Sequence, residues 1–159
     1  MKGFVSYAHQ NTRMFERFNK FIKRPVASIT GLEIWADSDN RTGDDFERKI
    51  LDQIAEADFF ILLVCADFLA SDFIWDKEMP AIRGRHQSGA LVLPVVLRPC
   101  LWDQVTGAHL ASPRDKNNRL VPVAKWSLRD EGYNQATAQV VASIRRYFNL
   151  PPSQAGVFT

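Results

Sequence analysis

This 159-residue chain has few cysteines and histidines, and neither sign of charge dominates. The two cysteines, Cys65 and Cys100, share no metal-ligand spacing with the three histidines, so we expect no metal site and two reduced thiols. The net charge is only +2, and lysine and arginine are scattered along the chain. These features argue against a nucleic-acid-binding surface.

Long apolar runs are also missing. No stretch approaches the roughly 18 apolar residues that a membrane-spanning helix needs. The first residues do not form a signal peptide, because Phe4 and Val5 are followed at once by polar residues. We therefore expect a cytoplasmic protein that makes no membrane contact. Its hydrophobic content of 46% is ordinary for a globular chain, and its length suits one domain with its own core.

Apolar runs alternate with helical periodicity along the chain. Strands are predicted at 2–7, 32–35, 59–65, 91–97 and 121–123, and helices at about 13–24, 46–57, 72–85 and 136–148. Pro25 is expected to end the first helix, and Pro80 either divides the third or starts a new turn. Pro94 predicts an edge position or a bulge for the fourth strand. Five strands alternating with helices predict an α/β domain with a mainly parallel sheet and right-handed crossovers.

One carboxylate stands inside an apolar pattern. The seven apolar residues 59–65 predict a strand buried on both faces, and Ser71 then resembles a helix N-cap. At helical spacing, Glu78 shares a face with Ile74 and Ile82. Ligands of open parallel sheets bind just past the carboxyl ends of strands, which makes Glu78 a site candidate. From the residues alone, a glutamate paired with a nearby arginine at a helix edge is an equally good interpretation.

A polar stretch, residues 36–45, follows the second predicted strand and has almost nothing to bury. Long polar loops in compact domains often carry function. We favour a contact surface here over a solvated connection.

Three stretches together resemble a Toll/interleukin-1 receptor (TIR) domain of the bacterial type. The residues from Phe4 to Tyr7 resemble the first box of the family, at the end of the first strand. Residues 34–50 resemble the second strand, the loop beyond it and the next helix, and residues 58–78 resemble the third strand and the segment with the catalytic glutamate. The resemblance covers nearly the whole chain. It implies a TIR domain over 1–149, with a flavodoxin-like open sheet of five mainly parallel strands and helices on both faces.

Many TIR domains of bacteria and plants are NAD-cleaving enzymes. The resemblance implies that Glu78 is the catalytic residue and that NAD+ is the substrate, with no further cofactor. A carboxylate can stabilise the oxocarbenium-like transition state or bond transiently to the anomeric carbon, and both roles stay open. Nicotinamide leaves as a neutral molecule, so no general acid is required. The product is ADP-ribose or a cyclic variant of it.

The same resemblance assigns substrate contacts to further residues. Tyr7 and Ala8 match the nicotinamide end of the cleft, Trp35 and Asp37 match positions near the substrate, and Trp75 is an aromatic wall for a base. From the residues alone, Trp35 fits the core better than a site. The chain departs from the family in two places. Many bacterial members have Trp where Ile74 stands, and several have Arg where Ala8 and His9 stand, which leaves His9 or Arg41 for the phosphates.

Partners are implied in the same way. Similar domains use the polar loop to contact the next copy, here through Asp39, Arg41, Gly43 and Asp45, and such head-to-tail contacts can build filaments. The linker-like residues 150–159 suggest a C-terminal sensor domain that clusters copies in bacterial anti-phage defence.

Two other functions stay open. One is a non-enzymatic module that binds other TIR domains, which has no need of Glu78 in an apolar face. The other is transfer of deoxyribose between bases, against which the long loop and the first box argue.

Overall fold

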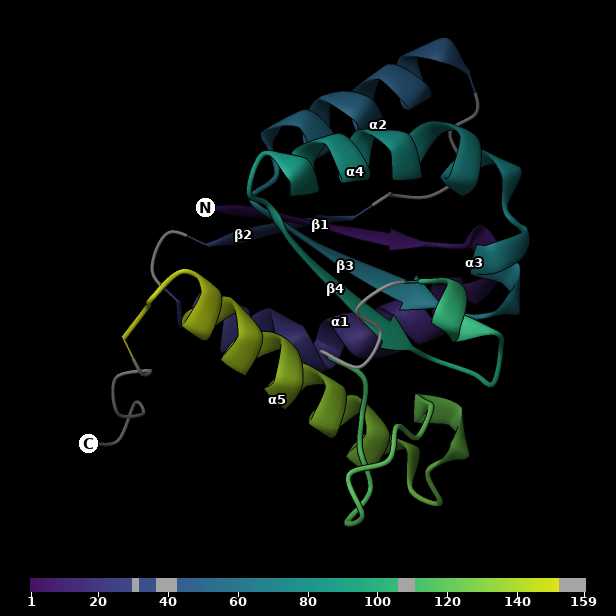
Figure 1. The fold of residues 1–159 in the computed structure, drawn as a ribbon, viewed down its shortest axis with the longest axis vertical. Coiled ribbons are helices and arrows are strands. Elements are labelled where there is room, and N and C mark those ends of the chain that lie inside the picture. Colours follow the sequence, from purple (N-terminus) through teal and green to yellow (C-terminus); the bar gives the residue numbers. More distant parts are fainter. Residues whose placement is uncertain (30–31, 37–42, 106–110, 152–159) are drawn as a thin grey trace.

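The computed structural model describes residues 1–29, 32–36, 43–105 and 111–151. Within these ranges, a parallel β-sheet lies between two layers of helices (Figure 1). The strands are β1 (Lys2–Tyr7), β2 (Glu33–Ala36), β3 (Phe59–Val64) and β4 (Leu91–Val96). The α-helices are α1 (Thr12–Ala27), α2 (Asp44–Glu56), α3 (Ala66–Ala70), α4 (Met79–Gln87) and α5 (Arg129–Tyr147). The predicted α/β class and parallel sheet are confirmed.

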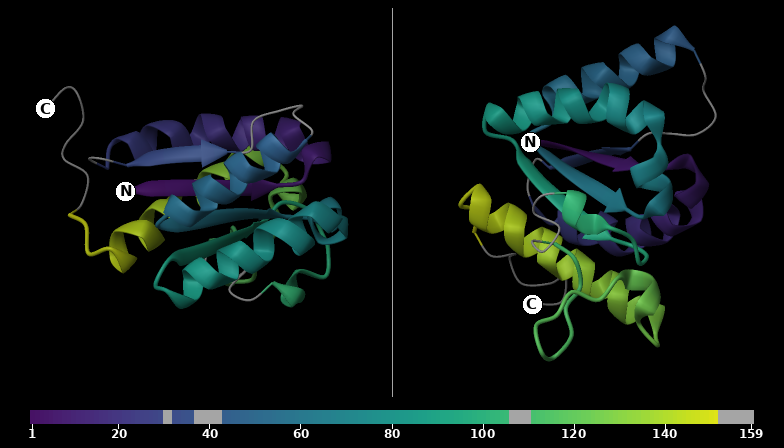
Figure 2. Two further views of the ribbon diagram at one scale, coloured as in Figure 1. Left: turned by 90° about the horizontal axis from the view of Figure 1, so that it is seen from above. Right: turned by 45° about the vertical axis from the view of Figure 1, so that its right-hand side comes forward.

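The strand order is β2-β1-β3-β4, and all three neighbouring pairs are parallel. All carboxyl ends therefore lie at one edge of the sheet, and α3 lies at that edge in Figures 1 and 2. The chain goes from β1 outward to β2 on one side and later to β3 on the other. The direction of winding thus switches between β1 and β3, where ligands bind in sheets of this kind.

The two faces of the sheet have separate hydrophobic cores. Helices α1 and α5 cover one face, and α2 and α4 cover the other, as the two views of Figure 2 show. Every residue of β3 is buried, and its side chains alternate between the cores. Phe59, Ile61 and Leu63 face α1 and α5, whereas Phe60, Leu62 and Val64 face α2 and α4. Burial on both faces explains why β3 is an unbroken apolar run.

The predicted fifth strand at 121–123 is wrong, since the sheet of the described residues has four strands. A 3-10 turn begins at Val123, and the N–H of Val121 bonds to the carbonyl oxygen of Pro113. Pro122, between them, has no N–H to give to a strand ladder. As predicted from Pro94, β4 is an edge strand, and the N–H of Val96 on its outer side donates to Ser112 Oγ at 2.9 Å.

The predicted end of the first helix at Pro25 is also wrong, because α1 continues to Ala27. Pro25 lies in the last turn, where the lost N–H costs one hydrogen bond and the helix ends two residues later. The N–H of Ser28 still bonds to the carbonyl oxygen of Arg24 at 3.0 Å. The proline is therefore tolerated near the C-terminus of α1.

Candidate functional site

Glu78 is the last residue of a π-helix, Ile74–Glu78, that lies between α3 and α4. Its side chain is only 2% exposed. The N–H of Met79 bonds to the carbonyl oxygen of Ile74, five residues back, which is the wide spacing of a π turn. Such single wide turns occur often at functional sites. The structure thus places a buried carboxyl group beyond the carboxyl end of β3.

The sequence explains this wide turn. Pro80 is in the first turn of α4 and cannot donate to the carbonyl oxygen of Asp76. Its ring also crowds that carbonyl in a regular α-helix, and a wider turn relieves the clash. Ser71 starts the segment, and its Oγ accepts a hydrogen bond from the N–H of Ile74 at 3.3 Å. The predicted N-cap is confirmed. Pro80 does not end the helical segment, but the turn before it is a π turn and not an α turn.

The start of α2 packs against the segment that carries Glu78. The rings of Phe46 and Phe73 stack with centroids 6.1 Å apart, and Lys77 Nζ lies 3.3 Å from Glu47 Oε1. Gly43, with φ of 129°, immediately precedes α2 in a conformation that favours glycine. The end of the polar loop is therefore joined to the Glu78 segment.

Of the predicted loop residues, the structure describes Gly43 and the exposed Asp45, which lies in the first turn of α2. Asp37, Asp39 and Arg41 lie outside the described residues.

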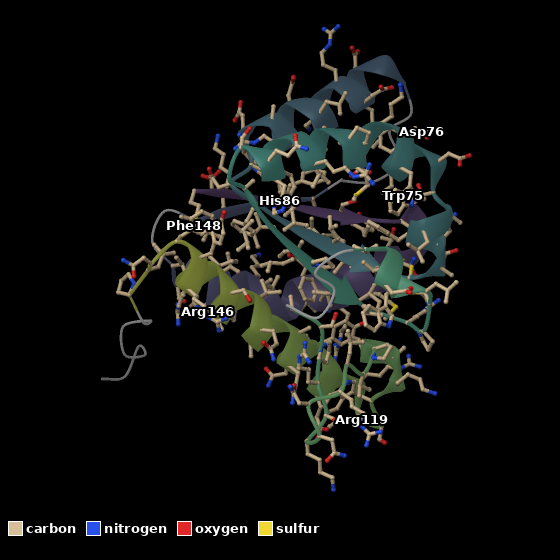
Figure 3. All side chains as sticks on the ribbon, in the orientation of Figure 1. Trp75, Asp76, His86, Arg119, Arg146 and Phe148 are labelled. Atoms are coloured by element: carbon tan, nitrogen blue, oxygen red, sulfur yellow. The ribbon has the colours of Figure 1, made fainter. Side chains whose placement is uncertain are left out.

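Trp75 lies within the same π turn and joins it to α3. Its ring meets Phe68 edge-to-face at 6.3 Å, and the guanidinium of Arg83 lies 5.9 Å from the ring centroid. Its Nε1 is buried and has no hydrogen-bond partner among the residues described. In Figure 3, Trp75 and Asp76 lie on the side of the molecule toward which the strands run. Trp75 and Glu78 thus share one short element at the carboxyl edge.

The exits of β1 and β3 meet through Asn11, a residue that the sequence patterns did not single out as functional. Its side chain is 2% exposed, and Nδ2 donates to Cys65 Sγ at 2.9 Å and to Asp67 Oδ2 at 3.3 Å. Within the described ranges, Asn11 Oδ1 and Ser6 Oγ are buried without a hydrogen-bond partner. Ala8, 2% exposed, belongs to the core under α2 and α4. The only sequence signal for this cluster was the polar composition of the loop after β1.

Two further predicted substrate contacts, Tyr7 and Trp35, pack against different cores. Tyr7 is 5% exposed and stacks on Phe15 at 4.2 Å, in the core beneath α1 and α5, whereas the Glu78 segment belongs to the opposite core. Trp35 pairs in register with Phe4, and Lys2 Nζ lies 4.6 Å from its ring. Trp35 is one residue from the carboxyl end of β2 and packs against the core under α2 and α4.

Trp35 also lines a shallow groove of about 330 Å³ along the outer side of α2. The other lining residues are Asp45, Arg48, Lys49, Asp52, Gln53 and Glu56.

Neither cysteine is in a disulfide, and the two differ in exposure. Cys65 is buried at the end of β3, and Cys100 is partly buried, which raises the pKa of its thiol. Among the described side chains, no group of three or more His, Cys, Asp or Glu is placed to hold a metal ion. A search of the described helices finds none that is long and apolar enough to cross a membrane.

Comparison with known proteins decides the family. The sequence model described as "TIR domain" matches residues 4–141, which include most of β1, the other three strands of the sheet and Glu78. The chain belongs to the TIR domain family. Its parallel sheet with helices on both faces is consistent with the TIR fold. The predicted domain limit at residue 149 stays a prediction.

This TIR domain is also similar to a bacterial protein of greater length. The uncharacterized protein y4lF of Sinorhizobium fredii (strain NBRC 101917 / NGR234) is 34% identical over 160 residues. The alignment covers 96% of this chain and 47% of the relative. The chain thus spans about half the length of the curated relative that it matches.

Proposed function

We propose that this TIR domain is an NAD+ glycohydrolase with Glu78 as its catalytic residue. The observation that carries the proposal is the position of the Glu78 carboxyl, 2% exposed in a π turn at the carboxyl edge of the sheet. The family includes NAD-cleaving members, so the proposed activity is compatible with it. A buried carboxylate is costly unless it is paired or hydrogen-bonded, and π turns and ionisable groups in unusual environments occur often at functional sites.

The proposed reaction breaks the bond between nicotinamide and the ribose anomeric carbon. The bonding electrons leave with the nicotinamide nitrogen, which thereby becomes neutral, and positive charge develops on the ribose. Water then bonds to the anomeric carbon and releases one proton, giving ADP-ribose; an internal nucleophile of the same molecule gives a cyclic variant. The negative charge of Glu78 stabilises the oxocarbenium-like transition state, and this effect is strong where water is excluded.

Access to Glu78 requires movement, because a carboxyl with 2% exposure cannot touch a dinucleotide. The stacking of Phe46 on Phe73 and the pair between Glu47 and Lys77 hold the start of α2 over the Glu78 segment. TIR domains typically interact with other TIR domains. We therefore propose that contact between copies through the loop ending at Gly43 and Asp45, with Asp39 and Arg41, shifts this cover.

The substrate contacts are part of the proposal to different degrees. Ala8 and Trp75 are supported as contacts because both belong to the core that lies beside the Glu78 segment. Trp35 packs against the same core, whereas Tyr7 packs on the other face of the sheet. Asp37 stays a predicted contact outside the described residues.

The proposed setting is the bacterial cytoplasm, in anti-phage immunity. There, clustering of TIR copies into head-to-tail assemblies would switch the enzyme on, under control of a C-terminal sensor domain. The length of the Sinorhizobium relative, about twice that of this chain, is compatible with a further region of this kind.

The test measures NAD+ loss and nicotinamide release at low and at very high protein concentration. Glu78→Gln keeps the shape of the side chain and removes its charge, and Glu16→Gln on the exposed side of α1 is the matched control. We expect turnover to rise steeply with concentration, to vanish in Glu78→Gln and to survive in Glu16→Gln. Turnover that persists in Glu78→Gln would place the site elsewhere.

A second candidate is a non-enzymatic module that binds other TIR domains, since contacts between TIR domains are typical of the family. In that case the carboxyl is a structural group, and the clustered wild-type protein releases no nicotinamide. Sedimentation of the same samples shows whether copies associate, so an assembled but inactive protein would support this second candidate.

A further inference from the structure

Asn11 links two loops that no backbone hydrogen bond among the described residues joins. It ends the short 3-10 turn His9–Asn11 that follows β1. Its Nδ2 reaches Cys65 Sγ at 2.9 Å and Asp67 Oδ2 at 3.3 Å, at the start of α3. The exit of β1 is thus fastened to the exit of β3 at the switch point of the sheet.

The link continues from α3 to the π turn. Phe68 of α3 is fully buried and meets the ring of Trp75 edge-to-face at 6.3 Å. Ser71 follows α3, and it accepts two hydrogen bonds, from the N–H of Ile74 to its Oγ and from the N–H of Trp75 to its carbonyl oxygen at 3.1 Å. A displacement of α3 therefore moves the turn that ends at Glu78.

The energetics of Asn11 point to a role beyond packing. Its Oδ1 is buried and has no partner in the described part of the chain. A buried polar atom in this state costs on the order of 1–3 kcal/mol. An apolar side chain of the same shape avoids that cost. The contribution of the amide therefore comes from the hydrogen bonds that Nδ2 donates to Cys65 and Asp67. Costly groups of this kind gather where function sets the geometry.

We propose that Asn11 is a positioning residue that sets Glu78 relative to Ala8, and so relative to the ribose between them. This inference rests on the proposed function for its catalytic consequence. Ala8 follows β1 directly, and Glu78 ends the π turn after α3, so the Asn11 contacts join the two segments that the proposal places on either side of the ribose. A misplacement of about 1 Å in such a pair lowers turnover by roughly 100-fold.

The first variant is Asn11→Leu, which keeps the shape of the side chain and removes its hydrogen bonds. We expect little change in stability, because removal of the unpartnered Oδ1 offsets the loss of the two hydrogen bonds from Nδ2. We expect kcat to fall by about 10- to 100-fold, with KM changed by less than about threefold. A merely structural residue would show the opposite pattern, a loss of stability with kcat per folded molecule unchanged.

The second variant is Asn11→Asp, which places a carboxylate against Asp67. Repulsion then opens the link at neutral pH, and protonation of one partner restores a hydrogen bond, so kcat should recover relative to the wild type as the pH falls. Adding Asp67→Asn reverses the donor and the acceptor, since the amide introduced at position 67 can then donate to the carboxylate introduced at position 11. This double variant should recover kcat at neutral pH. Failure of both recoveries in folded protein would overturn the inference.

Hydrogen exchange separates this inference from the proposed function. In Asn11→Leu, backbone amides of residues 66–79 should exchange faster, whereas those of α1 should not change. Unchanged exchange in 66–79, or wild-type kcat in Asn11→Leu, would overturn the role of Asn11. If the clustered wild-type protein cleaves no NAD+, the proposed function fails by itself, and the exchange result still decides whether Asn11 positions the Glu78 segment.

Discussion

Lys77 Nζ lies 3.3 Å from Glu47 Oε1, so the residue next to Glu78 is paired with the first turn of α2. The pair is half exposed, with side-chain exposures of 50% for Lys77 and 34% for Glu47. Exposed pairs of this kind contribute about 0.2–1 kcal/mol to folding. Lys77 lies within the π turn, and Glu47 lies just after the polar loop. The position of this ion pair therefore matters more than its contribution to stability.

Lys77→Met removes the pair and keeps most of the apolar stem. We expect the free energy of unfolding to fall by less than about 1 kcal/mol, measured by urea titration. If this pair helps to cover Glu78, nicotinamide release at low protein concentration should rise. The exchanged pair, Lys77→Glu with Glu47→Lys, should return it toward the wild-type level. If turnover at low protein concentration is the same in the wild type and in both variants, the pair does not cover Glu78.

Pro80→Ala tests the origin of the π turn. The alanine N–H can bond to the carbonyl oxygen of Asp76, and the clash of the proline ring is gone, so a regular α-helix becomes available. We expect the segment to tighten and Glu78 to rotate by part of a turn, with loss of NAD+ cleavage. Stability should hold or rise. Hydrogen exchange at residue 80 and the nicotinamide assay measure both effects, and an active variant would mean that the wide turn is not needed.

Substitution by alanine at two helical glycines should change the free energy of unfolding in opposite directions. A Cβ on Gly132 of α5 would lie 2.9 Å from the carbonyl oxygen of Val123 and 2.9 Å from Trp126 Cδ1, closer than real contacts allow. Gly132→Ala should therefore lower the free energy of unfolding by about 1–3 kcal/mol. A Cβ on Gly84 of α4 meets nothing within 4 Å, so Gly84→Ala should raise it by about 0.5–1 kcal/mol. Equal effects in urea titrations would contradict the packing of α5 on the 3-10 turn.

Asp115 predicts a local dependence on pH. The N–H of Arg119, and then that of Asn117, donates to Asp115 Oδ1 at 2.9 Å, and these bonds hold the pKa of the carboxyl below its usual value. Because the pKa is lowered in the folded state, the stabilisation is complete above the unfolded pKa of about 3.9. It is lost as the pH falls through the folded value.

An NMR titration of the Asp115 carboxyl carbon should give a midpoint below that of a model peptide. Asp115→Asn should remove the acid-dependent part of the stability of the turn. A midpoint at the peptide value would show that the two backbone hydrogen bonds are absent in solution.

Much of the fold could be predicted because it depends on neighbours along the chain. The apolar run of β3, the N-cap at Ser71 and the edge position implied by Pro94 are local signals, and all three are confirmed. The start of α5 was missed, because its first turns are polar and the apolar pattern begins only at Ala136. The prediction of a fifth strand was wrong because Val121 and Val123 have strand-like composition but no partner strand among the described residues.

Among the candidate site residues, the sequence pattern by itself singled out Glu78 and gave weaker signals for the others. Glu78 stood out because a charge inside an apolar face is unusual at any fold. Tyr7 could not be assigned to a face of the sheet, because strand residues alternate and the pattern does not say which core each side meets. Asn11 had no signal of its own beyond a polar loop.

The sequence by itself determined the class of fold, the four strands of the sheet and the apolar helix face on which Glu78 lies, because periodicity and caps act over a few residues. Only the tertiary structure decided the strand order, the separation of Tyr7 from the Glu78 segment and the link from Asn11 to Asp67. That link joins residues 56 positions apart. Contacts over such distances form only when the whole sheet brings strand ends together, and no local pattern encodes them.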